Sequence, residues 1–167
     1  GGSLIVDEIY QGLVYDGEDY TALAVSEDCL VVNSFSKFFQ MTGWRLGWLV
    51  APNALIEPLE RIAMNAFLAA PTVAQYAALA AFQPDTLQLL DARRDEMRRR
   101  RDYLLQALQE LGFVIPAKPQ GAFYIYADCS QRCDDSYQFA VDLLAHSHVA
   151  ITPGLDFGHN KPERFIR

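Results

Sequence analysis

A lysine surrounded by anion-binding residue types stands in the stretch SFSKFFQMTGWRLGW, residues 34–48. Lys37 follows two serines, and the segment after it supplies Thr42, Gly43 and Arg45. Hydroxyl groups, an arginine fork and the backbone N–H groups of a glycine-containing turn are suited to binding a phosphate monoester. A lysine beside them can form a Schiff base with an aldehyde. The stretch therefore predicts a site for a phosphorylated aldehyde.

An acidic residue is placed to complete such a site. Asp7 follows the apolar run at residues 4–6, and Ser34 and Ser36 lie at the end of a second expected strand, residues 30–35. Short, continuously apolar runs are typical of buried parallel strands, whose carboxyl ends form the ligand-binding edge of an open sheet. A carboxylate there can keep a pyridinium nitrogen protonated. Phosphate, aldehyde and pyridine together indicate pyridoxal 5'-phosphate (PLP).

Each residue taken alone also has an ordinary explanation. Asp7 is equally consistent with capping the turn that follows it, and Lys37 with a side chain in water. The combination of both clusters with Tyr10, Thr42 and Arg45 favours the cofactor site over these separate explanations.

Composition narrows the class of protein. The 167 residues are 51% hydrophobic and carry a net charge of -7, which is typical of a globular protein and argues against a nucleic-acid-binding module. No apolar run approaches the roughly 18 residues of a membrane helix. With an odd number of cysteines, a reducing, cytoplasmic setting is expected. Cys129 and Cys133 lack a second pair of ligands, so no metal site is predicted.

Hydrophobic periodicity predicts an α/β fold in two parts. Strands alternating with helices in the first half indicate a parallel sheet, and the second half is a smaller α+β unit. The boundary is expected within a long helix, which gives domains 1–95 and 96–167. Arginines and acids are mixed on that helix, and this pattern favours a solvated face with ion pairs. The expected strands are 4–6, 30–35, 45–51, 113–115, 122–127, 149–152 and 165–167; the expected helices are 55–67, 73–82, 84–111 and 137–144.

The residues also resemble a known family. "VDEIYQGLVY" followed by "VVNSFSKFFQMTGWRLGWLVAP" resembles the aspartate-aminotransferase-like (class I/II) PLP enzymes of fold type I. Their signature is Ser-x-[small]-Lys, then a short stretch leading to Gly-x-Arg-[aliphatic]-Gly. "PQGAFYIYAD" and "ITPGLDFG....ERFIR" extend the resemblance to the end of the chain. The signature is matched by Ser34, Ser36, Lys37, Gly43, Arg45, Leu46 and Gly47.

The resemblance implies a role for each matched position. Lys37 would carry the internal aldimine and move the substrate α-proton, and Asp7 would pair with the pyridinium nitrogen. Tyr10 would hydrogen-bond the 3'-oxygen of the cofactor. Arg167 would bind the substrate α-carboxylate, a bidentate contact that lysine makes poorly. The phosphate would be bound by Ser34 and Arg45, with Ser36 as a further candidate.

The resemblance also implies an activity and an architecture. The chain would be the C-terminal part of a PLP-binding large domain with a mainly parallel sheet, followed by a small α+β domain. The enzyme would transfer an amino group between an L-amino acid and a 2-oxo acid, as a homodimer. Elimination at a C–S bond on the same scaffold and a non-enzymatic sensor domain stay open. Both ends of the chain look cut, so we expect a segment of a longer protein, inactive by itself.

Three features stand outside this assignment. Gln40 occupies a position that is usually small in the family, so the turn after Lys37 is expected to pack differently. Asp156-Phe157-Gly158 spells a kinase magnesium motif but lacks the companion motifs, and in the PLP family it is a loop before the substrate arginine. Strand packing is the preferred explanation for the aromatic residues Phe123, Tyr124 and Tyr126.

Overall fold

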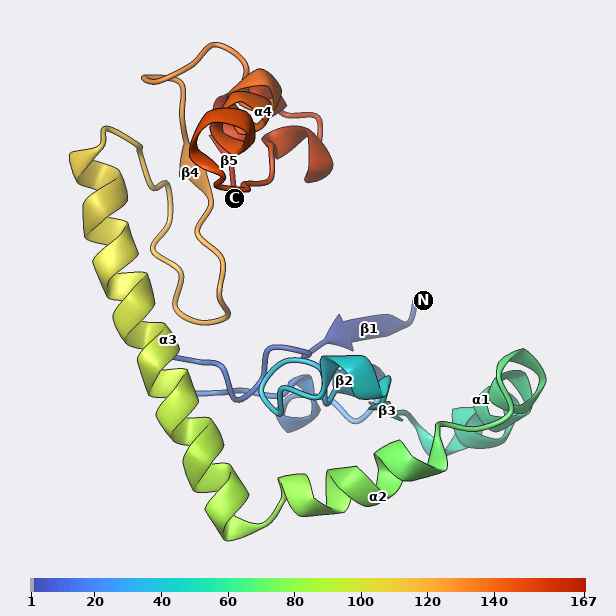
Figure 1. The fold of residues 1–167 in the computed structure, drawn as a ribbon. Helices are drawn as coiled ribbons and strands as arrows, with labels where there is room; N and C mark the ends of the chain where they lie inside the picture. Colours follow the sequence, from blue (N-terminus) through green and yellow to red (C-terminus); the bar gives the residue numbers. More distant parts are fainter. Residues whose placement is uncertain (1) are drawn as a thin grey trace. The chain divides into compact units, whose positions relative to one another are not determined.

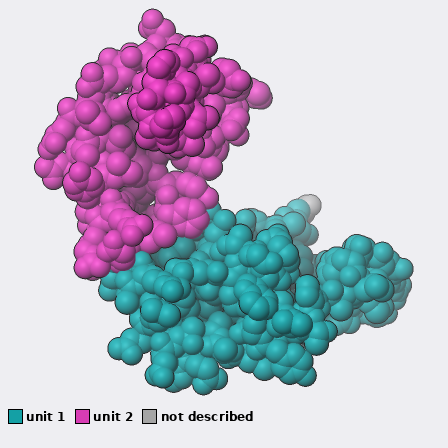
Figure 2. All heavy atoms as spheres, viewed as in Figure 1, with its two compact units in different colours: residues 1–95 teal, residues 96–167 magenta. Residues whose placement is uncertain are grey.

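The computed structural model describes residues 2–167. The chain divides into residues 1–95 and 96–167 (Figure 2), and the division lies within one long helix. No helix in the described part of the chain is both long and apolar enough to cross a membrane. The elements, drawn in Figure 1, are β1 (Leu4–Asp7), η1 (Ala22–Ala24), β2 (Cys29–Ser34), η2 (Thr42–Trp44), β3 (Gly47–Val50), α1 (Asn53–Ala66), α2 (Thr72–Ala81), α3 (Pro84–Glu110), β4 (Ala127–Asp128), α4 (Ser136–Ser147), η3 (Gly154–Asp156), η4 (Pro162–Arg164) and β5 (Phe165–Ile166).

The first unit contains a three-stranded sheet in the order β1-β2-β3. β1 and β2 are parallel, with Asp7 beside Val32. β2 and β3 are antiparallel, with Ser34 opposite Gly47. The prediction of a parallel arrangement is therefore wrong for β3. The connection between β2 and β3, residues 35–46, contains only the short turn η2, whereas a parallel return is usually made by a helix packed on the sheet.

The core of this unit lies on one face of β2. Cys29, Val31 and Asn33 are buried, and they alternate with less buried residues as expected for a strand. The burial predicted for β1 is wrong within the described chain, because Leu4 and Ile5 are 59% and 66% exposed. β1 is an edge strand of this sheet, so it has a strand neighbour on one side only.

Helix α2 supplies a second part of that core. Phe35, Ala78 and Ala81 are buried together, with Phe39 and Met41 packed against them. The helix boundaries agree with the predicted ones to within a few residues. Gly112 has φ +85°, a left-handed conformation that favours glycine, and it ends α3 where the sequence predicted a stop.

The second unit is built on a two-stranded antiparallel pair, β4 and β5, with Asp128 opposite Phe165. Ala127, Cys129 and Ile166 form its buried cluster, against which Phe139 of α4 packs. α4 begins at the predicted place, because the Asp135 side chain accepts hydrogen bonds from the first backbone N–H groups of the helix.

Three strands predicted in the second unit are wrong or reduced. Residues 113–115 make only an isolated bridge, Val114 to Asp128, and the segment 122–127 is a strand only from Ala127 onward. Residues 149–152 form no strand, although Thr152 exchanges backbone hydrogen bonds with Arg167. Ala122 has φ 57°, which interrupts the extended conformation that its aromatic neighbours favour.

Candidate functional site

Two loops meet at one edge of the first unit's sheet. β1 and β2 are parallel, and Asp7 lies beside Val32, so the carboxyl end of β1 and residue Ser34 at the end of β2 lie at the same edge. Because β3 runs antiparallel, its first residue, Gly47, pairs with Ser34. Arg45 precedes Gly47 and therefore enters at that edge as well. The sheet thus gathers a carboxylate, a hydroxyl and a guanidinium.

The loop between β2 and β3 is closed by its own hydroxyl groups. The Ser34 Oγ accepts a hydrogen bond from the Ser36 backbone N at 3.0 Å and lies 3.0 Å from the Ser36 Oγ and 3.1 Å from the Leu46 carbonyl oxygen. The Thr42 Oγ1 donates to the Ser36 carbonyl at 2.6 Å. Both predicted serines are therefore adjacent and held in defined positions.

Arg45 adopts an uncommon backbone conformation. Its φ of 54° and ψ of 53° are left-handed, which costs a non-glycine residue about 1–2 kcal/mol. Its Nη1 donates to the Thr42 carbonyl at 2.9 Å, and the residue is exposed. Such conformations persist where the surroundings impose them and cluster at ligand sites. The structure thus gives the predicted phosphate-binding arginine a specific backbone placement.

Gln40, the departure from the family pattern, is also left-handed, with φ 57°. Its side-chain Oε1 accepts a hydrogen bond from Arg93 Nη1 of α3 at 2.6 Å. The larger side chain therefore ties the turn after Lys37 to α3, a contact that a small residue could not make.

Lys37 and Tyr10 come together at this edge from the loops that follow β2 and β1. The Lys37 Nζ lies 5.6 Å from the centroid of the Tyr10 ring, within the range of a cation–π contact. Both residues are half-buried. The lysine side chain is therefore directed to the loop after β1, which also carries Asp7.

Asp7 makes the capping contact that its ordinary explanation requires. Its Oδ1 accepts a hydrogen bond from the backbone N of Ile9 at 3.0 Å. A carboxylate has several acceptor positions, so one capping bond does not use its full capacity. The residue is exposed at the end of β1, and capping and ligand binding are compatible at this position.

Asn33 is a positioning residue that sequence reasoning missed. It is 6% exposed, and its Nδ2 donates to the Gln11 Oε1 at 3.1 Å. Its Oδ1 accepts from the backbone N of Ser34 at 2.7 Å. The side chain therefore links the loop that carries Tyr10 to the start of the serine loop. An asparagine inside an apolar strand was the available signal, because a buried polar group needs partners.

The two glycines of the signature have different surroundings. A Cβ added at Gly47 would lie 2.7 Å from the Asn33 carbonyl oxygen, so β3 can pair closely with β2 only without a side chain there. A Cβ at Gly43 would meet nothing within 4 Å among the described residues. Close packing of β3 on β2 therefore explains why residue 47 is a glycine, whereas packing does not explain the glycine at position 43.

Arg167, the predicted carboxylate-binding residue, lies in the second unit, whereas the other predicted site residues lie in the first. Its backbone N donates to the Thr152 carbonyl at 2.8 Å, and its carbonyl accepts from the Thr152 N at 2.9 Å. Its guanidinium carbon lies 4.2 Å from the Tyr124 ring centroid and 4.1 Å from that of Phe157. Both the backbone and the charged group are held within this unit.

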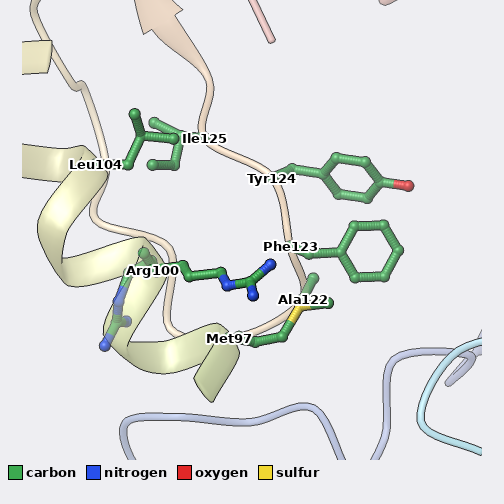
Figure 3. A pocket seen from close by; sticks show the side chains of 9 residues that line it. Met97, Arg100, Leu104, Ala122, Phe123, Tyr124 and Ile125 are labelled. Carbon is green, nitrogen blue, oxygen red and sulfur yellow. The ribbon is translucent and has the colours of Figure 1, made fainter. Parts of the chain in front are cut away.

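A pocket of about 210 Å³ separates α3 from residues 121–125 in the second unit (Figure 3). Beside it, the buried Arg101 donates from Nη1 to the Pro119 carbonyl at 2.5 Å, and its Nε lies 2.8 Å from Asp102 Oδ1. This arginine fastens the following loop to the helix.

The predicted solvated face of α3 is confirmed at Glu96, which pairs with the exposed Arg99 and Arg100.

Comparison with known proteins gives one consistent group of relatives. The family model "Aminotransferase class I and II" matches residues 1–167. Valine–pyruvate aminotransferase of Mycobacterium tuberculosis is 42% identical over 166 residues, which cover 98% of this chain and 43% of that protein. (5-Formylfuran-3-yl)methyl phosphate transaminase of Methanocaldococcus jannaschii is 38% identical over 167 residues, with coverages of 98% and 44%.

The solved structures agree. An aminotransferase from Mycobacterium tuberculosis superposes with a TM-score of 0.93 at 40% identity, covering 98% of this chain and 43% of that one. The present chain thus spans less than half the length of the curated relatives it matches.

Proposed function

The chain belongs to the aminotransferase class I and II family, and on that premise we propose that it is the C-terminal part of a PLP-dependent enzyme. The enzyme would transfer an amino group between an L-amino acid and a 2-oxo acid. The observation that carries the proposal is that Asp7, at the end of β1, and the Ser34–Lys37 loop, at the end of β2, lie at the same edge of two parallel strands. Residues 1–95 would belong to the PLP-binding domain and residues 96–167 to the small domain.

The chemistry of the donor set fits PLP. Ser34, Ser36 and Arg45 would bind the phosphate, because hydroxyl groups and a guanidinium are its natural partners. Asp7 would hold the protonated ring nitrogen, and the Tyr10 hydroxyl would donate to the ring oxygen. When bound, PLP supplies an electron sink that stabilises negative charge at the substrate α-carbon.

Lys37 would have two tasks. Its amine would hold the cofactor aldehyde covalently before substrate arrives, since amines are the nucleophiles for carbonyl groups. Once the substrate amine has replaced it, the Lys37 Nζ would accept the proton from the substrate α-carbon. It would then donate this proton to the cofactor carbon that had carried the aldehyde. The half-buried position beside the Tyr10 ring limits the directions that the side chain can take.

Arg167 would bind the α-carboxylate shared by amino acids and 2-oxo acids. A planar guanidinium forms two parallel hydrogen bonds with a carboxylate and so fixes its orientation. The same residue could therefore serve both half-reactions, because both substrates carry that carboxylate.

The two relatives described above favour transamination over elimination or sensing, since one is an aminotransferase and the other a transaminase. The family resemblance further leads us to propose a homodimer. Leu4, Ile5 and Leu49 are exposed apolar residues of the sheet, and exposed apolar surface marks places where further protein packs. Light scattering of the complete enzyme would test the dimer.

Product analysis tests the proposed reaction. The complete enzyme, supplied with PLP and a panel of amino-acid and 2-oxo-acid pairs, should form the exchanged products. Lys37→Ala should lower the rate at least about a hundredfold, the scale of general acid–base catalysis. The exposed Lys118→Ala serves as the matched control and should retain full activity. Release of ammonia instead would indicate elimination, and the absence of any product would favour the sensor.

A further inference from the structure

The Arg167 guanidinium lies over two aromatic rings. Its central carbon is 4.2 Å from the Tyr124 ring centroid and 4.1 Å from the Phe157 ring centroid. The two rings come from separate segments of the second unit, one before β4 and the other after η3. From the sequence, Phe157 is expected in a loop before the substrate arginine and Tyr124 in strand packing, but no contact of either ring with Arg167 is predicted.

A guanidinium that contacts ring faces keeps its N–H donors for other partners when its plane is stacked on those faces. A cation is attracted to the face of an aromatic ring, and a planar guanidinium can also stack on it. Its five N–H donors point outward in the plane and away from rings stacked on its faces. A carboxylate approaching in that plane can form the bidentate pair. Arg167 is exposed, as such access requires.

The ring beside Arg167 is itself held by further rings. Phe157 packs edge-on against Tyr126, with centroids 5.9 Å apart and planes at 89°. Tyr126 stacks on Phe165, with centroids 4.9 Å apart and planes at 8°. Phe165 and Arg167 are two residues apart along the chain, and both lie at the β5 end of the unit. The Phe157 ring is thus supported from the same strand that leads to the arginine.

The Tyr124 ring has a corresponding neighbour. Its centroid lies 4.7 Å from that of Phe123, and the two rings project on the same side of their segment (Figure 3). The backbone of Arg167 is fixed by its two hydrogen bonds to Thr152. Backbone and guanidinium are therefore held independently, the first by Thr152 and the second by rings.

From this geometry we propose that Tyr124 and Phe157 are positioning residues that hold the Arg167 guanidinium as a fixed fork for a substrate carboxylate. The proposal rests on the proposed function, because it deepens the role given to Arg167 there. The rings act through the arginine by restricting its rotation, so their removal weakens carboxylate binding. A freely rotating side chain must lose more conformational freedom on binding.

Binding of a carboxylate that cannot react tests the proposal separately from turnover. The probe is 3-methylbutanoate, and its uncharged analogue 3-methylbutanamide is the comparison ligand, both titrated calorimetrically into the complete PLP-loaded enzyme. Phe157→Leu and Tyr124→Leu should each weaken 3-methylbutanoate binding about fivefold, as expected for losing one cation–π contact. Amide binding should stay unchanged. Phe157→Tyr and Tyr124→Phe keep the rings and should restore the wild-type affinity.

Kinetics supply a second readout. The leucine variants should raise KM for both substrates about fivefold with little change in kcat, because the carboxylate is bound throughout the reaction. Tyr137→Leu removes an exposed aromatic residue of α4 and should change neither quantity.

The outcomes separate this proposal from the proposed function. Unchanged carboxylate affinity in both leucine variants overturns the positioning role even if the enzyme transaminates. Equal weakening of the acid and the amide, or equal loss in the ring-keeping variants, also overturns it, because general disruption would then be the cause. Arg167-dependent binding that weakens in the leucine variants supports it, even if no amino-acid pair turns over. The proposal would also be overturned if Arg167→Ala bound 3-methylbutanoate with the wild-type affinity.

Discussion

The Lys37 Nζ lies 5.6 Å from the centroid of the Tyr10 ring, so the loops that follow β1 and β2 meet at one edge of the sheet. The contact joins residues that are far apart in sequence and that were predicted to act together. It depends on the parallel pairing of β1 and β2, which brings both carboxyl ends to the same place. The Asn33 side chain of β2 links these two loops through its hydrogen bonds to Gln11 and to the Ser34 backbone.

Asn33→Ala should destabilise the protein by about 1–3 kcal/mol, because it removes two hydrogen bonds and leaves the Gln11 side chain without that donor. We also expect weaker PLP binding, since the loops carrying Tyr10 and Ser34 lose their link. Urea denaturation and PLP titration measure the two effects. Asn65→Ala, which removes an exposed side chain on α1, should change stability by less than about 0.5 kcal/mol. Equal stability of both variants would contradict this account.

Gly47→Ala should cost about 1–3 kcal/mol of stability, because the new Cβ would stand 2.7 Å from the Asn33 carbonyl oxygen and push β3 from β2. Gly43→Ala is the matched control from the same signature, and nothing lies within 4 Å of its added Cβ. Its stability should be within about 0.5 kcal/mol of the wild type. Denaturant unfolding of both variants measures these changes in stability. If Gly43→Ala lowers stability as much as Gly47→Ala, close pairing of β3 with β2 is not the cause of the loss.

Cys129 should make stability fall in alkaline solution. Burial, together with its hydrogen bond to Cys133, raises the pKa of the Cys129 thiol to about 12. In the unfolded chain a thiol has a pKa of about 8.5, so between these values the unfolded chain releases a proton that the folded chain keeps. This contribution to stability is complete below about pH 8.5 and is lost as the pH rises through this window.

Denaturation at several pH values compares Cys129→Ala with the wild type. The stability of the variant should decline less steeply as the pH rises above about 8.5.

A brief alkylation pulse at pH 8 is a second measurement, and it should label the half-buried Cys133 before the fully buried Cys129. Parallel declines in both proteins, or equal labelling of both thiols, would contradict the assignment.

The sequence was informative where a local signal coincided with the tertiary structure. Apolar runs ending in polar residues predicted β1 and β2, and the sheet rule then predicted that Asp7 and Ser34 would be neighbours. Gly112 marked the end of α3 because a left-handed residue is needed there. These inferences rest on chain geometry within one element or between two strands.

Other features depended on partners that periodicity does not reveal. The antiparallel direction of β3 follows a connection that holds no crossover helix, and this direction determines that Arg45 enters at the site edge. Tyr124 and Tyr126 have strand-forming side chains, yet their rings take part in the stacking around Arg167 and Phe157, and the backbone forms no ladder there. Burial of β1 was predicted from its short, continuously apolar run, and such a run cannot say what covers a strand.

The most direct test of the central claim is to identify the residue that binds PLP covalently. The complete enzyme is mixed with PLP, its visible absorption is recorded, the protein is reduced with borohydride, and the labelled peptide is sequenced by mass spectrometry. We predict a visible band and a label on Lys37, both lost in Lys37→Ala and kept in Lys118→Ala. A band and a label that persist in Lys37→Ala would contradict the account.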